Sequence, residues 1–141
     1  MDRKSILGFV VLLDKGAISW GSKKQTSMSL STIEAEFIAT LTAVKEILWH
    51  QSLFSSLDMI LTSPTSLLIN NQGALDLIKS GQINDCTKHI DIKFRYVCDQ
   101  EDQGMILSQH VAMQEQIADI MTKPLGTEKF SYFREIIGVH V

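Results

Sequence analysis

The chain has 141 residues, which is enough for one ordinary domain and too few for two comfortable ones. Hydrophobic residues make up 45% and charged residues 21%, a balance that excludes a disordered chain and favours a folded globular one. The net charge of -3 excludes a protein that binds nucleic acid through an overall excess of Lys and Arg, so any such binding needs a local basic patch.

The cysteines and the apolar segments indicate in which cellular compartment the protein is expected. Cys86 and Cys98 form neither a disulfide framework nor a metal-ligand spacing. The apolar run at residues 7–13 is very short for a signal peptide and is followed by Asp14 and Lys15. No segment approaches the roughly 20 apolar residues of a membrane span. We therefore expect a cytoplasmic or nuclear protein that is not secreted and does not contact membranes.

The first third of the chain predicts a β-hairpin. Residues 7–13 and 17–23 are rich in strand-forming residues and flank a short turn that ends at Gly16, where a positive φ costs least. In the second strand, Ile18 and Trp20 share one face because side chains alternate along a strand.

A long helix is predicted next, from about residue 31 to residue 57. Ser31 and Glu34 have the spacing of a capping box, in which each side chain serves a backbone N–H at the start of the helix. Apolar residues then recur at helical spacing and predict one buried face, formed by Ile33, Phe37, Leu41, Val44 and Leu48.

The rest of the chain alternates strands and helices. Residues 66–70 form an apolar strand with little alternation, which predicts cover on both faces. A helix from residue 71 should end at Gly81, a typical C-cap. The remaining predicted elements are a helix with Ile90, Phe94 and Val97 on one face, a strand at 105–111, a helix at 114–123 and a helix with Phe130, Phe133 and Ile137 on one stripe. This order predicts an α/β layer fold with a mixed sheet.

Five segments, in this order, resemble the ribonuclease H region of copia-type retrotransposon polyproteins. They are residues 2–11, 16–39, 70–81, 87–94 and 116–125, and they span the chain from Asp2 to Leu125. The resemblance implies a ribonuclease H-like domain over residues 1–126, a mixed sheet flanked by helices, and a C-terminal helical tail over residues 127–141. It also implies hydrolysis of RNA in RNA·DNA hybrids by two Mg²⁺ ions held by carboxylates.

The resemblance assigns the metal ligands residue by residue. The helix glutamate of the family matches Glu36, with Glu34 as the alternative, and its late aspartate matches Asp119. Where the family has an aspartate at the end of the middle strand, this chain has Asn70, which keeps the shape but loses the charge. Asn70 is then expected to act as an N-cap of the following helix.

The fourth family carboxylate lies on a strand upstream of Asp2. That strand is central in the sheet of the family, so we expect a truncated sheet with two exposed strand edges. With two of four carboxylates missing, we expect an inactive ribonuclease H-like relic that does not depend on Mg²⁺.

Two other functions stay open. Glu36 and Asp119 could retain weak metal binding in an enzyme whose missing strand comes from another chain. The exposed sheet edges could instead bind a peptide strand or a second copy of the chain. Weak binding of an RNA·DNA hybrid would use phosphate contacts, and the residues that could supply them are Lys23, Lys24, Lys88 and His89.

Overall fold

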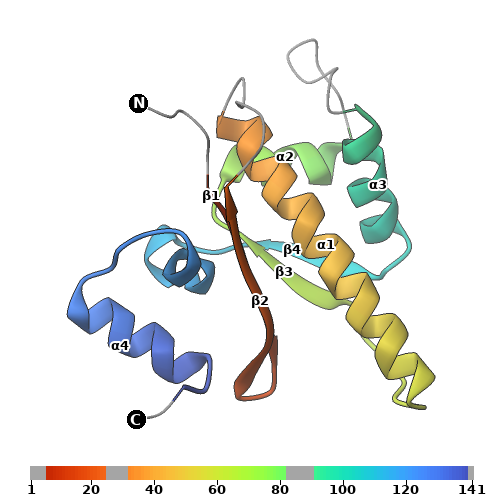
Figure 1. Ribbon diagram of the computed structural model, residues 1–141. Coiled ribbons are helices and arrows are strands. Elements are labelled where there is room, and N and C mark those ends of the chain that lie inside the picture. Colours follow the sequence, from red (N-terminus) through yellow and green to blue (C-terminus); the bar gives the residue numbers. More distant parts are fainter. Residues whose placement is uncertain (1–5, 25–31, 82–90, 140–141) are drawn as a thin grey trace. The chain divides into compact units, whose positions relative to one another are not determined.

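A computed structural model describes residues 6–24, 32–81 and 91–139 and shows a mixed α/β protein (Figure 1). The chain divides into two compact units, which are described separately below. Met1–Met28 and Ile117–Val141 form the first, called the hairpin unit, and Ser29–Gln116 form the second, called the central unit. The prediction of one domain over residues 1–126 with a separate tail stays a prediction.

The predicted hairpin is present in the hairpin unit. Strand β1 (Ile6–Leu13) pairs with β2 (Gly16–Lys24) in antiparallel register, and Ile18 and Trp20 share the more exposed face of β2 as predicted. The positive φ of the turn falls on Asp14, at 54°, and not on Gly16 as we expected. Aspartate tolerates this left-handed conformation better than most residues because its short polar side chain can hydrogen-bond locally.

Two short helices complete the hairpin unit. The 3-10 helix η3 (Ile117–Met121) and the following Thr122 pack so closely on β1 that a Cβ added at Gly8 would lie 3.1 Å from Met121 Cβ and 2.4 Å from Thr122 Cγ2. Helix α4 (Thr127–Ile136) ends where the carbonyl of Ile137 accepts a hydrogen bond from Ala17 N at 2.9 Å. Its expected apolar stripe is only partly buried, because Phe133 is fully buried while Phe130 is 45% exposed.

The single helix predicted for residues 114–123 is wrong. The segment forms two 3-10 helices, η2 (Met113–Glu115) and η3, separated at Gln116 by an extended backbone with ψ of 100°. The Gln116 side chain donates to the carbonyl of Leu68 at 3.1 Å, so a tertiary hydrogen bond accompanies this break.

The described residues of the central unit form three α-helices, two strands and the 3-10 helix η2. Helix α1 (Thr32–Ser56) is followed by β3 (Thr65–Ile69), α2 (Gln72–Ser80), α3 (Asp91–Asp102) and β4 (Ile106–His110). The predicted apolar face of α1 is confirmed at Phe37, Leu41 and Val44, which are buried. The predicted capping residue Ser31 lies outside the described residues, and so does Ile90 before α3.

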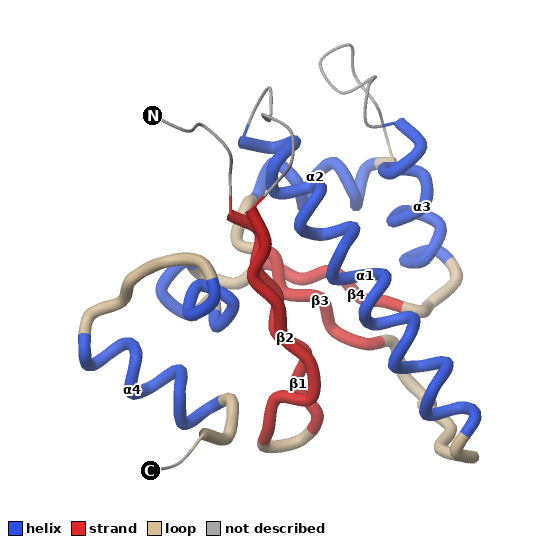
Figure 2. Tube along the Cα trace, viewed as in Figure 1, coloured by secondary structure: helices blue, strands red, loops and turns tan. Residues whose placement is uncertain are grey.

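The core of the central unit lies on one face of the parallel pair β3–β4, drawn in red in Figure 2. The three helices pack on this face, and their buried apolar residues cluster with Leu67, Ile69 and Ile106 of the two strands. On the other face, Leu68 is 44% and Leu107 is 41% exposed. The expected cover on both faces of this strand is therefore wrong, because α1, α2 and α3 all lie on the same side.

The four strands do not join into one mixed sheet. Within the described residues they form two separate two-stranded sheets, β1–β2 and β3–β4. The hairpin pair is antiparallel and the other pair is parallel, so both pairing types of a mixed sheet are present without a strand that connects them.

Candidate functional site

Glu36 lies in the second turn of α1, next to the fully buried Phe37. Its side chain is half-buried, and its carbonyl oxygen accepts a hydrogen bond from the Thr40 hydroxyl at 2.9 Å. Glu34, the alternative ligand from the sequence, is half-buried as well. Burial therefore does not decide between the two glutamates.

Asn70 follows β3 directly and is half-buried. The predicted role of Asn70 as N-cap of the next helix is wrong. Asn71 is the N-cap of α2, and its side-chain oxygen accepts from Ala74 N at 2.9 Å. Asn70 thus lies at the end of the strand without forming the cap, at the position where the resemblance implies a carboxylate. The predicted C-cap at Gly81 is confirmed by its φ of 66° and its hydrogen bond to Leu77 O.

Asp119 belongs to η3 of the hairpin unit and is only 7% exposed. A buried carboxylate needs a cation or hydrogen-bond donors. Lys123 supplies one, because its Nζ lies 3.4 Å from Asp119 Oδ2. The carboxylate that the family resemblance assigns as a metal ligand therefore already forms an ion pair with a lysine four residues further along the chain.

The described residues do not fit a site for two Mg²⁺ ions. No three His, Cys, Asp or Glu side chains in the described part of the chain form a group that could hold a metal. Asn70 offers a neutral amide, and the carboxylate of Asp119 is paired with Lys123. Two divalent cations side by side need several charged oxygen ligands. We therefore derive no catalytic step through a metal.

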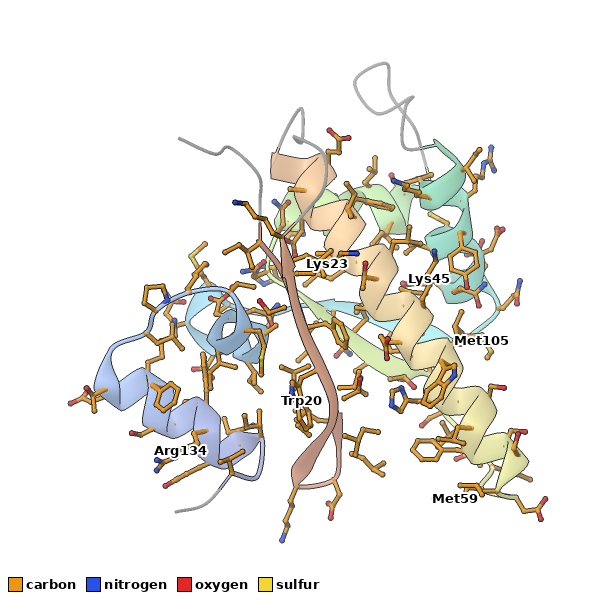
Figure 3. All side chains as sticks on the ribbon, in the orientation of Figure 1. Trp20, Lys23, Lys45, Met59, Met105 and Arg134 are labelled. Atoms are coloured by element: carbon orange, nitrogen blue, oxygen red, sulfur yellow. The ribbon has the colours of Figure 1, made fainter. Side chains whose placement is uncertain are left out.

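The predicted nucleic-acid contacts are only partly within the described residues. Lys23 and Lys24 are exposed at the end of β2, and Lys23 is labelled in Figure 3. Lys88 and His89 lie outside the described residues.

A polar cluster that the sequence did not predict joins α2, α3 and β4. The carboxylate of Glu101 pairs with Lys79 through one oxygen, and its other oxygen accepts from Ser108 N at 3.2 Å. Burial alone would raise the pKa of Glu101, but hydrogen bonds from Lys79 and Ser108 and the Lys79 charge together hold it below its ordinary value of 4.5. Lys79 and Glu101 are 22 residues apart, so no local sequence pattern reveals the pair.

The thiol of Cys98 is not activated for nucleophilic chemistry. Burial, together with the negative charges of Asp102, Asp99 and Glu101, raises its pKa to about 11. Since the thiolate is the reactive form, Cys98 is almost entirely in the unreactive thiol form at neutral pH. The Cys98 thiol instead donates a hydrogen bond to the carbonyl oxygen of Ile78, with Sγ 3.6 Å from that oxygen, and so links α3 to α2.

Among the described residues, no helix combines the length and the apolar character that crossing a membrane requires.

Comparison with known proteins identifies similar sequences but no similar structure. No family model matches the chain, and no solved structure matches it. The chain is 32% identical over 139 residues to the retrovirus-related Pol polyprotein from transposon TNT 1-94 of Nicotiana tabacum. It is 35% and 33% identical, each over 138 residues, to the corresponding polyproteins from transposons RE1 and RE2 of Arabidopsis thaliana.

These alignments cover 98 to 99% of this chain but only 9 to 10% of each polyprotein. The chain therefore spans about a tenth of the length of these relatives, and its homologues are retrovirus-related Pol polyproteins from plant transposons.

Proposed function

We propose that this chain is a ribonuclease H-like region of a copia-type retrotransposon polyprotein that has lost hydrolytic activity. Similarity to plant transposon polyproteins along nearly the whole chain supports the origin. The five motif segments support the assignment to the ribonuclease H region. Such a protein acts where nucleic acid is present, in the cytoplasm or nucleus.

Asn70 carries the proposal of inactivity. It stands at the end of β3, where the family has a carboxylate, and an amide cannot supply the negative charge that two Mg²⁺ ions require. The pairing of Asp119 with Lys123 points in the same direction. Weak binding of an RNA·DNA hybrid through lysines such as Lys23 remains part of the proposal, because phosphate contacts need only positive charge.

The decisive experiment combines Mg²⁺ titration with a cleavage assay. Thermal melting of the 141-residue chain is measured with and without Mg²⁺, because a ligand that binds the native state raises the melting temperature. Cleavage of a labelled RNA·DNA hybrid is measured beside it, with Asn70→Asp as the comparison. We expect neither a shift nor cleavage in the original chain. Mg²⁺-dependent cutting that Glu36→Ala or Asp119→Ala abolishes would contradict the proposal.

A second candidate function uses the outer edge of β3 to bind another strand. Thr65 N donates to Met105 O, and Val111 N donates to Ile69 O, so the odd-numbered residues of β3 face β4. The N–H and C=O groups of Ser66 and Leu68 therefore point to the opposite edge. Among the described residues, no strand pairs with that edge. The Gln116 side chain, however, donates a hydrogen bond to the carbonyl oxygen of Leu68.

Leu68→Pro tests this candidate. Proline removes the Leu68 N–H, which points away from β4, so the β3–β4 pairing can stay intact while strand addition loses a donor. If β3 pairs with a second copy, this variant should abolish self-association in sedimentation velocity. Unchanged self-association would reject strand addition at β3.

A further inference from the structure

The charge of the chain is distributed unevenly between its two units. The hairpin unit carries eight Lys and Arg against five Asp and Glu, a balance of +3, whereas the central unit carries five against eleven, a balance of -6. The net charge of -3 is therefore the sum of one basic unit and one acidic unit. Because a basic surface attracts polyanions, the hairpin unit is the part of the chain in which to look for a polyanion site.

The two strands of the hairpin unit carry positive charge only. β1 has no charged residue, and the charged residues of β2 are Lys23 and Lys24, both exposed. No Asp or Glu occurs from residue 16 to residue 33. The turn between the strands adds no net charge, since Asp14 stands beside Lys15. The positive charge of the hairpin therefore lies at the end of β2, and no acidic residue of either strand offsets it.

An exposed aromatic ring lies on the same face of β2 as one of these lysines. Trp20 and Lys24 are four residues apart in a strand, so both side chains point to one face, roughly 13 Å apart along it. Trp20 is 61% exposed, and Ser22 between the two is exposed and small. Figure 3 labels Trp20 on β2. So much exposure is unusual for tryptophan, whose large ring gains much from burial.

The neighbouring strand limits the width of this surface. Ser22 pairs with Gly8 of β1, and Thr122 fills the space where a side chain of Gly8 would lie. The β1 side of this face is therefore covered at Gly8, while Trp20, Ser22 and Lys24 on the β2 side stay exposed. We call these three residues the β2 strip. A strip one strand wide suits an extended chain better than the broad contact of two folded proteins.

We propose that the β2 strip binds single-stranded nucleic acid. An unpaired base stacks on the indole ring of Trp20, and a phosphate of the same strand contacts Lys24. The stack requires a base whose face is uncovered, so a duplex or hybrid, with its bases stacked within the helix, is a poorer ligand. The inference goes beyond the proposed function, which concerns hydrolysis and phosphate contacts of lysines such as Lys23. Lys23 points to the opposite face of β2.

Fluorescence titration of single-tryptophan variants tests the stacking. The chain has two tryptophans, and Trp49 is the matched control because it is also 61% exposed but belongs to the acidic central unit. Trp49→Phe leaves Trp20 as the reporter, and an oligodeoxythymidylate of about 12 nucleotides should quench its emission with saturation. Trp20→Phe leaves Trp49 as the reporter, and the same titration should produce no saturable change.

Fluorescence anisotropy of the labelled oligomer measures the affinity. Trp20→Ala should raise the dissociation constant about fivefold or more, the effect expected for the loss of one stacked base. Trp49→Ala should leave the dissociation constant unchanged. Far-ultraviolet circular dichroism checks that each variant is folded.

The salt dependence of binding tests the phosphate contact. Lys24→Gln should weaken binding and reduce the slope of log association constant against log salt by about 0.7, the value for one phosphate contact on a single strand. Lys45→Gln is the control, because Lys45 is an exposed lysine of the central unit. It should change neither the affinity nor the slope.

Equal quenching of Trp20 and Trp49 would overturn the proposal, and so would an affinity that Trp20→Ala leaves unchanged. An RNA·DNA hybrid of the same length is the second ligand. If it binds as tightly as the single strand and quenches Trp20 equally, stacking of an unpaired base is rejected. None of these measurements involves cleavage, so their outcome is separate from the loss of hydrolytic activity.

Discussion

Glu101 connects three elements of the central unit through one carboxylate. It lies in α3, pairs with Lys79 of α2 and accepts the backbone N–H of Ser108 in β4. The hydrogen bonds that favour its ionised form outweigh the burial that opposes it, so the pKa of Glu101 in the folded protein is lower than in the unfolded chain.

This lowered pKa predicts a pH-dependent stability. The ionised carboxylate stabilises the folded state fully above its unfolded pKa of about 4.5, and this contribution is lost as the pH falls through the lower folded pKa. The variant Glu101→Gln should therefore be less stable than the original chain at pH 7. The difference should shrink in urea unfolding measured at progressively lower pH below 4.5. A difference that stays constant over this range would show that the charge of Glu101 does not contribute.

At the residue scale, sequence patterns predicted the candidate capping and ligand residues but not the groups that these residues contact. Asn70 and Asn71 are equally good N-cap residues by type, and only the position of Ala74 N selects Asn71. The sequence also marks Asp119 as a candidate ligand, and its four-residue spacing from Lys123 would bring the two together in the expected helix as well, but the burial of Asp119 is visible only in the structure.

At the level of elements, helices with a clear buried face were predicted well. Residues 31–57 were expected to be helical, and α1 covers Thr32–Ser56 because its apolar residues recur at helical spacing over many turns. The segment at 114–123 has too few apolar repeats to show whether a helix continues across Gln116. The tertiary hydrogen bond from Gln116 to Leu68 O accompanies a break that local pattern cannot reveal.

The N-cap of α2 gives a prediction with a built-in control. Asn71→Ala removes the acceptor for Ala74 N and should lower the free energy of unfolding by about 1 kcal/mol. Asn70→Ala, one residue away, should change it by much less because Asn70 is not the cap. Chemical denaturation of both variants measures the difference. Equal losses would mean that the two asparagines share the capping role.

For the whole molecule, the order of strands and helices was predictable, but their assembly was not. The sequence pattern of a strand shows which of its side chains share a face. It does not show which strand lies beside it, because pairing joins segments that are far apart in the chain. The sequence led us to expect a mixed sheet that lacks its central strand, and in the described residues the strands form two separate pairs in two units.

Because the chain divides into two compact units, we expect a substitution that destabilises one unit to have its main effect within that unit. Gly8→Ala places a Cβ against Thr122, Met121 and Ala118 of the hairpin unit and should destabilise that unit by about 1–3 kcal/mol. Gly126→Ser is the control, since nothing lies within 4 Å of a Cβ at Gly126. Hydrogen exchange should show faster exchange in β1 with unchanged protection in α1 and β3. Equal loss of protection throughout would indicate one cooperative unit.

The contact between Ser108 N and Glu101 has a consequence for aggregation. Ser108 N points away from β3, so the carboxylate occupies a donor that an incoming chain would need in order to extend the sheet beyond β4. Growth by stacking of identical copies into a fibril requires two available sides on every molecule. With one side obstructed by a charged group, we expect strand addition through this sheet to stop at the β4 edge. We therefore expect Glu101→Ala to make this edge more available for pairing with another chain.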